Sequence, residues 1–196
     1  LTVSAAKVFG ITRTPVVIFE NVTQAVGKGE WERAMRLLRR ADYHVSIRTL
    51  NAEWFGVPMH RRRVFAVCTQ PGYKFDFGAS VDQYSADAAS RPRPCINDVM
   101  PDVSALYYLG RGRRDPCVVS AALPAPSFRC NCAYYPKRHR RRERDVDSFS
   151  QTREPTVHEL KQLIGWPADA YVPERRSAAG KILGNSVAPP VTRWLG

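Results

Sequence analysis

With 196 residues, 44% of them hydrophobic, the chain is long enough for one main domain and an attached module. Its 30 lysines and arginines against 18 aspartates and glutamates give a formal net charge of +12, which favours a polyanionic partner, nucleic acid ahead of an anionic membrane surface. No apolar run approaches the roughly 18 residues that span a bilayer, and the start lacks the features of a signal peptide, so we expect a soluble cytoplasmic protein, associated with the nucleoid if it is bacterial.

The first predicted element is a strand over residues 15–22, Pro-Val-Val-Ile-Phe-Glu-Asn-Val. Its apolar run delivers a carboxylate, Glu20, and an amide, Asn21, to the point where the strand should end. Ligands of open α/β sheets bind at the carboxyl ends of strands, so both residues are candidates for a functional site. The alternative is that Glu20 only begins a solvated turn.

An amphipathic helix and two strands follow. Residues 30–41 place apolar side chains at near-helical spacing, with arginines on the other face, which predicts a helix that packs on a sheet. The patterns over residues 43–50 and 63–69 predict two strands. Strand, helix, strand and strand in this order indicate an α/β fold.

The composition of the sequence changes near Gly72. From there to about Arg153, Gly, Pro, Ser, Asp and Arg dominate, and apolar runs are short, so we expect a loop-rich inserted module with short strands. Basic residues concentrate at 110–114 and 137–144. One such run is usually a solvated or mobile face, but two runs in one polar module favour contact with phosphates.

Helical signals return near the C-terminus. Thr156 as N-cap, Glu159 three residues later and Gly165 as a stop predict a helix between them. A second helix is expected after the Gly-Asn-Ser-Val segment at 184–187, with the Asn or the Ser in the turn that opens it.

Four motifs occur along the chain in an order that resembles the DNA cytosine-5 methyltransferases. They are Glu-Asn-Val at 20–22, Gly-Val-Pro-Met-His-Arg-Arg-Arg-Val-Phe at 56–65, the region from 153 that ends in Gly-Trp-Pro at 165–167, and Gly-Asn-Ser-Val at 184–187. The family carries Glu-Asn-Val at a strand end, a Gly-Val-Pro-Gln-x-Arg-x-Arg segment, a helix that commonly ends in Phe-Pro or Tyr-Pro, and a terminal Gly-Asn-Ser-Val. Each motif alone is weak, but all four in sequence are specific.

The resemblance implies catalytic roles for three residues. Methylating carbon 5 of cytosine requires a nucleophile at carbon 6, which pushes negative charge onto ring nitrogen 3 and oxygen 2. By resemblance Glu20 stabilises the charge at nitrogen 3 and Arg63 that at oxygen 2, while Arg61 helps to organise the site and the DNA backbone. Arginine suits this task because it stays charged and presents a planar fork of donors. For both arginines the alternative is the solvated start of a strand.

The resemblance also implies a methyl donor and a DNA partner. Asn185 and Ser186 would lie near S-adenosylmethionine, although the same segment is also an ordinary helix cap. The module sits where the family carries its target recognition domain, and Pro-Ala-Pro-Ser-Phe-Arg at 124–129 resembles a Pro-Thr-Val-Arg stretch of such domains. Arginine reads guanine and grips phosphate. The candidate contacts to double-stranded DNA are Asn21, Arg113, Arg114 and Arg129.

The sequence departs from the family by an absence and a substitution. Neither a Phe-x-Gly-x-Gly donor loop nor a Pro-Cys-Gln nucleophile segment precedes Glu20. Cys95 and Cys117 each follow a proline, but they lie after the motif that they should precede, so neither is expected to be the nucleophile. Met59 replaces the Gln of the family and cannot donate the hydrogen bonds of an amide, for which His60 is the candidate to compensate.

The five cysteines indicate neither a disulfide framework nor a metal site. Their odd number and irregular spacing suit free thiols in a reducing compartment. Cys130 and Cys132 lack the usual spacing of a zinc-binding pair, and no second close pair exists, so we expect no metal. Cys68, at the end of a predicted strand, is expected to be buried.

The sequence therefore predicts an α/β protein, the second half of a Rossmann-like, mostly parallel methyltransferase sheet with an inserted, loop-rich and short-stranded target recognition module. We expect a partial catalytic α/β domain over 1–72, the recognition module over 73–152, and C-terminal helices that return to the catalytic domain over 153–196. Such a chain would be the C-terminal portion or subunit of a DNA (cytosine-5-)-methyltransferase. It would be inactive without an N-terminal half that carries the nucleophilic cysteine, either in the same chain or as a separate subunit. The alternative is a catalytically inactive, sequence-specific DNA-binding or regulatory partner of a methyltransferase.

Overall fold

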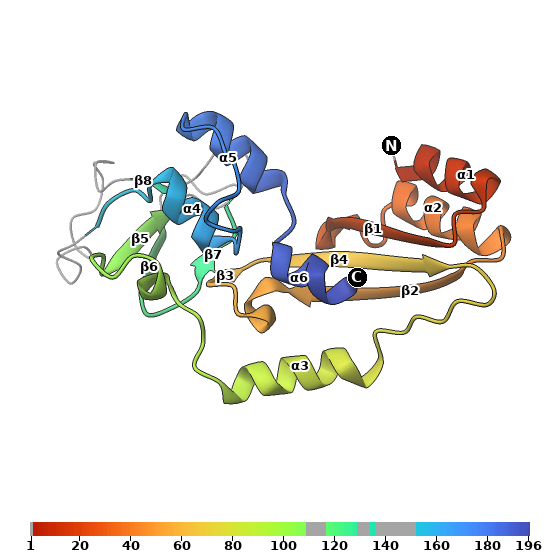
Figure 1. Ribbon diagram of the computed structural model, residues 1–196, viewed down its shortest axis with the longest axis horizontal. Coiled ribbons are helices and arrows are strands. Elements are labelled where there is room, and N and C mark those ends of the chain that lie inside the picture. Colours follow the sequence, from red (N-terminus) through yellow and green to blue (C-terminus); the bar gives the residue numbers. More distant parts are fainter. Residues whose placement is uncertain (1, 109–116, 129–133, 136–151) are drawn as a thin grey trace. The chain divides into compact units, whose positions relative to one another are not determined.

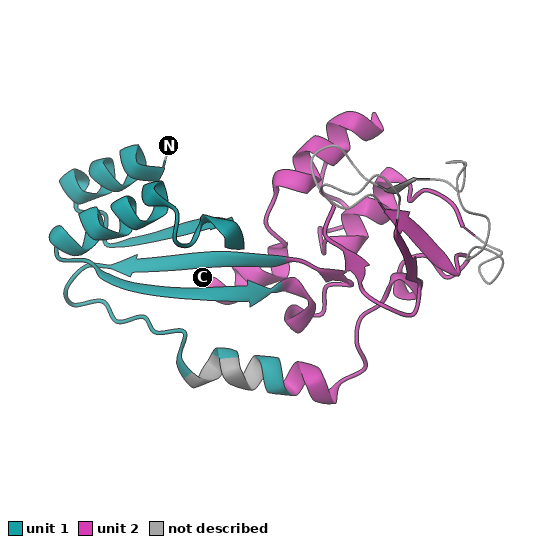
Figure 2. Ribbon diagram, turned by 180° about the vertical axis from the view of Figure 1, so that it is seen from behind, with its two compact units in different colours: residues 1–51, 62–86 teal, residues 52–61, 87–196 magenta. Residues whose placement is uncertain are grey.

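The computed structural model covers the 196-residue chain and describes residues 2–108, 117–128, 134–135 and 152–196. The chain forms two compact units (Figure 2), the first from residues 1–51 and 62–86 and the second from residues 52–61 and 87–196. The expected division into three parts, with boundaries after residues 72 and 152, stays a prediction.

A three-stranded sheet is the centre of the first unit (Figure 1). Its strands are β1 (Val16–Val22), β2 (His44–Asn51) and β4 (Arg62–Thr69), in the order β1-β4-β2. All three predicted strands are thereby confirmed. The expected mostly parallel pairing is wrong for this part of the sheet, because β4 runs antiparallel to both neighbours. A short connection from β2 to β4 permits only the antiparallel arrangement, whereas a helix returns the chain between β1 and β2.

Two helices cover one face of this sheet. They are α1 (Thr2–Thr12) and α2 (Gly29–Arg40), which lie beside each other in Figure 1. Helix α2 is the predicted amphipathic helix, and its apolar side packs on alternate residues of β1 and β4. The buried side chains include Trp31, Met35 and Leu38 of the helix and Val17, Phe19, Val64 and Cys68 of the strands. Cys68 is buried as predicted, and burial raises the pKa of its thiol to about 12.

A segment expected to be loop-rich contains helix α3 (Gly78–Ser90). Its sequence is rich in Ala, Ser and Asp and has no apolar stripe, so periodicity does not distinguish it from a loop. Alanine nevertheless has a high helix propensity, which accounts for α3. Before α3, Ser46 donates a hydrogen bond to the carbonyl oxygen of Phe75 at 3.1 Å, and Phe75 contacts Phe77 edge to face.

Short strands and short helices make up the second unit. An antiparallel sheet has the order β6-β5-β8, and a two-stranded parallel sheet joins β3 to β7. The strands are β3 (Met59–His60), β5 (Ala105–Tyr108), β6 (Cys117–Ser120), β7 (Ala125–Pro126) and β8 (Tyr134–Tyr135). The single helical turns are η1 (Thr23–Ala25) in the first unit and η2 (Ala52–Phe55) and η3 (Ile96–Asp98) in the second. Strands β5 and β6 confirm the short apolar runs, while both basic runs, 110–114 and 137–144, lie outside the described residues.

Three helices follow the module, α4 (Val157–Leu163), α5 (Arg176–Asn185) and α6 (Pro189–Leu195). Helix α4 begins with the predicted capping box, in which Thr156 and Glu159 satisfy each other's backbone N–H groups. Gly165 ends it with a φ of 77°, and a Cβ at this position would lie 3.0 Å from Val57. A helix follows residues 184–187 as expected, but those residues do not open it, since Asn185 ends α5 and Ala188 caps α6.

Arg153 joins the segment before β5 to the start of α4. Its guanidinium binds both carboxylate oxygens of Asp102 at 2.5 and 2.6 Å and both of Glu159 at 2.6 and 2.8 Å. The hydrogen bonds from Arg153, together with its charge, hold the pKa of each carboxyl group below its ordinary value. The chain that leaves after residue 102 is thus fixed beside the start of α4, to which it returns.

We expect this network to make stability depend on pH. A carboxylate with a pKa lowered by folding stabilises the protein fully above its unfolded value, and this contribution is lost as the pH falls through the folded value. With ordinary values of 3.8 for Asp102 and 4.5 for Glu159, the free energy of unfolding should fall below about pH 4.5. Urea denaturation from about pH 7 to about pH 3 measures it. The fall should be smaller in Arg153→Met than in the control Arg175→Met, and equal pH profiles would contradict the account.

Candidate active site

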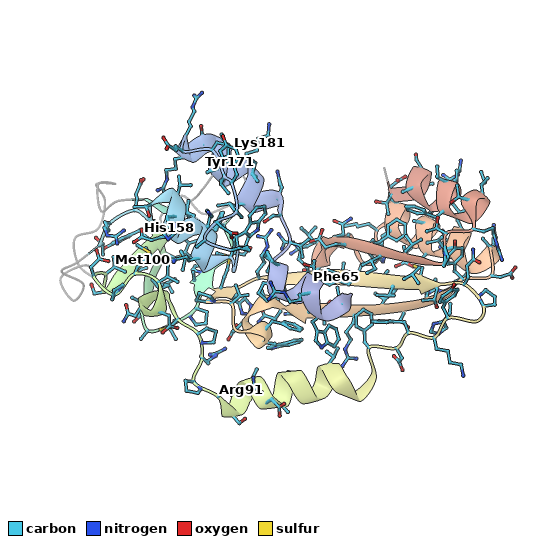
Figure 3. All side chains as sticks on the ribbon, in the orientation of Figure 1. Phe65, Arg91, Met100, His158, Tyr171 and Lys181 are labelled. Carbon is cyan, nitrogen blue, oxygen red and sulfur yellow. The ribbon has the colours of Figure 1, made fainter. Side chains whose placement is uncertain are left out.

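Glu20 and Arg63 form an ion pair on the face of the first unit's sheet that is opposite to α1 and α2. The register pairs Val22 with Arg63 and Glu20 with Phe65, so Glu20 and Arg63 are diagonal neighbours on one face. Nε of Arg63 lies 3.0 Å from Oε1 of Glu20. Phe65, labelled in Figure 3, marks this position on β4. Strand pairing thus brings Glu20 and Arg63 into contact, although they are 43 positions apart in the sequence (63 less 20).

The pair is partly accessible and electrostatically coupled. The side chain of Glu20 is 27% exposed and that of Arg63 is 16% exposed. Burial lowers the pKa of Arg63, and the charge and hydrogen bond of Glu20 oppose this effect. Arginine cannot be deprotonated in proteins, so its charge persists. A carboxyl group and a guanidinium side by side can address two adjacent atoms on the edge of a planar ring.

Asn21 lies on the other side of the sheet from this pair. Side chains alternate along a strand, and Asn21 pairs with Val64, which belongs to the helix-covered core. Its Oδ1 accepts a hydrogen bond from the backbone N–H of Val22 at 2.8 Å. The structure therefore does not bring Asn21 together with Glu20, and its role as a DNA contact stays a prediction.

Arg61 is buried in the second unit, with 2% of the residue exposed. Its Nη2 donates to the carbonyl oxygens of Gly184 at 2.9 Å and Ser186 at 2.6 Å. Its Nη1 donates to Oγ of Ser127 at 3.1 Å and to the carbonyl oxygen of Phe128 at 3.4 Å. The two arginines of the Arg-x-Arg motif thus have different surroundings, and Arg61 organises the protein around it.

In the Gly-Asn-Ser segment the serine side chain is hydrogen-bonded and the asparagine side chain is exposed. Oγ of Ser186 donates to the carbonyl oxygen of Leu183 at 2.9 Å and lies 3.2 Å from Nε1 of Trp166, which donates to it. Asn185, the last residue of α5, is exposed. Of the two predicted donor contacts, Asn185 therefore has the accessible side chain, and the Ser186 hydroxyl orders the turn beside it.

Met59 and His60 also differ in their surroundings. Met59 is fully buried on β3, so it contributes apolar packing where the family carries an amide. His60 is bound through Nδ1 to a carboxylate oxygen of Glu53 at 2.9 Å. Glu53 is buried and also accepts a hydrogen bond from Nε of Arg93 at 2.8 Å. Neither Glu53 nor Arg93 was a candidate from sequence, because no local signal joins residues 40 positions apart (93 less 53).

Several predicted residues lie outside the described part of the chain. They are Arg113, Arg114, Arg129, Cys130 and Cys132. Across residues 2–108, 117–128, 134–135 and 152–196, no group of three or more His, Cys, Asp or Glu residues could hold a metal ion. The same ranges contain no helix with the length and hydropathy that a bilayer crossing requires.

Comparison with known families places the chain. A family model, described as C-5 cytosine-specific DNA methylase, matches residues 1–114, which include Glu20, Arg61 and Arg63. The chain belongs to this family. The resemblance read from the four motifs is thereby confirmed. A search of curated proteins found no match.

Solved structures show that this methylase chain has a methyltransferase fold. The methyltransferase Dnmt2 of S. pombe matches with a TM-score of 0.63 at 18% identity, over 92% of this chain and 64% of that one. The Entamoeba histolytica methyltransferase EhMeth gives 0.57 at 12% identity, over 92% and 61%. A putative DNA modification methyltransferase from an E. coli prophage gives 0.61 at 15% identity, over 97% and 70%. The α/β fold class is confirmed, and the chain spans less than two thirds of the first two relatives' length.

We expect the buried Arg61 to be important for the stability of this methylase chain. Arg61→Ala leaves main-chain carbonyl oxygens at the end of α5 and in the loop after β7 without their donor, and each buried group left unsatisfied is costly. The free energy of unfolding should fall by on the order of 3 kcal/mol, measured by urea denaturation. The exposed neighbour is the control, since Arg62→Ala should change it by less than about 0.5 kcal/mol. Similar losses in both variants would contradict this assignment.

Proposed function

We propose that the chain is the C-terminal portion or subunit of a DNA (cytosine-5-)-methyltransferase that methylates carbon 5 of cytosine in duplex DNA. The observation that carries the proposal is the Glu20–Arg63 pair, which sets an acid beside a guanidinium on a partly accessible sheet face. Membership of the C-5 cytosine-specific methylase family supports the same reaction. The net charge of +12 supports a DNA partner.

In this proposal Glu20 and Arg63 bind the cytosine edge. When a nucleophile adds at carbon 6, negative charge develops at nitrogen 3 and oxygen 2 of the ring. The carboxyl group of Glu20 takes up a proton and donates it in a hydrogen bond to nitrogen 3, and the guanidinium of Arg63 donates to oxygen 2. Donors fixed before the reaction stabilise this charge without reorganisation. The 3.0 Å contact between Glu20 and Arg63 holds both groups in place.

S-adenosylmethionine supplies the methyl group in this family. Asn185 would contact it, because an exposed amide at the end of α5 suits the polar amino-acid and ribose groups of the donor. Ser186 would act through the turn that its hydroxyl orders with Leu183 and Trp166. The chemistry of these side chains therefore fits the donor.

The nucleophile would come from an N-terminal half. Cys68 is the cysteine of the first unit, and its burial and raised pKa of about 12 make it unreactive. In the described part of the chain β1 pairs with β4 alone, so its other edge is open. The same strand exposes Val16, Ile18 and Val22 by 43 to 46%. An open edge and an exposed apolar row support the pairing of a further strand from a cysteine-bearing half along β1.

Co-expression with a methyltransferase N-terminal half that carries Pro-Cys-Gln tests the proposal. We expect transfer of labelled methyl groups from S-adenosylmethionine to duplex DNA. Glu20→Gln and Arg63→Ala should each lower the rate by about 100- to 1,000-fold, since the amide of glutamine has no acidic proton to share with nitrogen 3 and alanine cannot donate to oxygen 2. Arg62→Ala serves as the matched control and should retain the activity.

The decisive result against the proposal is the absence of methyl transfer in a folded complex of verified composition. Salt-sensitive duplex binding by that complex, unchanged in Glu20→Gln, would then favour the catalytically inactive DNA-binding partner.

A further inference from the structure

We propose that Arg61 is a positioning residue that couples methyl-donor binding to DNA binding in the completed enzyme. The inference rests on the proposed function and adds an interaction between its two ligands. Arg61 joins two segments of the second unit that are far apart in the sequence. The C-terminal end of α5 carries the predicted donor contacts, and the loop after β7 precedes a predicted DNA contact.

On the donor side, Arg61 binds the carbonyl oxygens on both sides of Asn185. Gly184 and Ser186 provide these oxygens at the C-terminal end of α5, where carbonyl groups lack partners within the helix. A cation is also favoured there by the helix dipole. With its two neighbours in the chain held by one guanidinium, Asn185 has a fixed backbone from which its exposed side chain projects.

On the DNA side, Arg61 binds the loop that follows β7. Its acceptors are the Ser127 hydroxyl and the Phe128 carbonyl, and Phe128 is itself buried. The parallel pairing of β3 with β7 sets His60 against Pro126, so each strand ends one residue before these contacts. The next residue after Phe128 is Arg129, a candidate DNA contact. Arg129 itself lies outside the described residues, and Arg61 binds the two residues that precede it in the sequence.

A planar guanidinium makes the two segments depend on each other. Its donors have fixed directions, so a shift of one segment changes the geometry available to the other. Burial adds to this dependence, because a buried charge is costly when its acceptors move away. A ligand that orders one segment therefore fixes Arg61 and lowers the entropy cost of ordering the second segment. By linkage, each ligand raises the affinity for the other by the same factor.

The test is the coupling factor in the completed enzyme, this chain with its N-terminal half. The probes are S-adenosylhomocysteine and a duplex with the sequence that the wild-type enzyme methylates. Calorimetry gives the Kd of S-adenosylhomocysteine with and without the duplex, and the ratio of the two should be at least about 5 in the wild type. In Arg61→Lys, which keeps the charge but not the fork, the ratio should fall towards one while both ligands still bind.

Ser127→Ala is the second variant, since it removes one contact on the DNA side without touching the donor side or the charge. Its ratio should fall in the same direction, whereas the exposed control Arg62→Ala should keep the wild-type ratio. A wild-type ratio of one, or unchanged ratios in both Arg61→Lys and Ser127→Ala, would overturn the inference. If the completed enzyme methylates DNA but its two ligands bind independently, only the coupling is refuted. If it methylates no DNA, the proposed function is refuted, and the inference with it.

Discussion

The antiparallel register of β4 between β1 and β2 is the constraint on which the candidate site depends. It sets Val22 opposite Arg63, so the carboxylate of Glu20 meets the guanidinium one diagonal step along the same face. Side chains alternate with a period of two, and a slip of one residue would turn Arg63 towards the helices and Cys68 out of the core. The apolar core under α1 and α2 therefore fixes the polar pair on the opposite face.

The segment before β4 uses the same alternation for a second purpose. Met59 and Arg61 are buried, while His60 and Arg62 are exposed. The buried residues bind the second unit together, the thioether by packing and the guanidinium through acceptors in two segments. One short stretch of sequence thus supplies a partly accessible arginine that pairs with Glu20 and a buried arginine that binds acceptors in the second unit. The two arginines of the Arg-x-Arg motif therefore differ in their surroundings and in the groups that they bind.

Sequence reasoning was most successful where a physical period or a cap dominates. The strands and α2 follow from alternation and an apolar stripe, and α4 follows from the Thr156–Glu159 capping box. Helices α1, α3 and α5 are not predicted, because none of their sequences has a clear apolar stripe, so only packing of the folded chain distinguishes them from loops. The motifs named Glu20 and Arg63, but their contact depends on strand register. Arg61 was expected to help organise the site and the DNA backbone, and its acceptors are distant in sequence and carry no local signal.

The central claim is that this chain contributes a base-binding acid and guanidinium to an active site whose nucleophile lies on another half. Covalent trapping tests it most directly, because a duplex with 5-fluorocytosine at the target position has no proton to lose from carbon 5, and the enzyme stays attached at carbon 6. The account predicts an adduct on the N-terminal half of the completed enzyme, identified by mass spectrometry, with a yield that collapses in Arg63→Ala. An adduct on a cysteine of this chain, or an undiminished yield in Arg63→Ala, would contradict it.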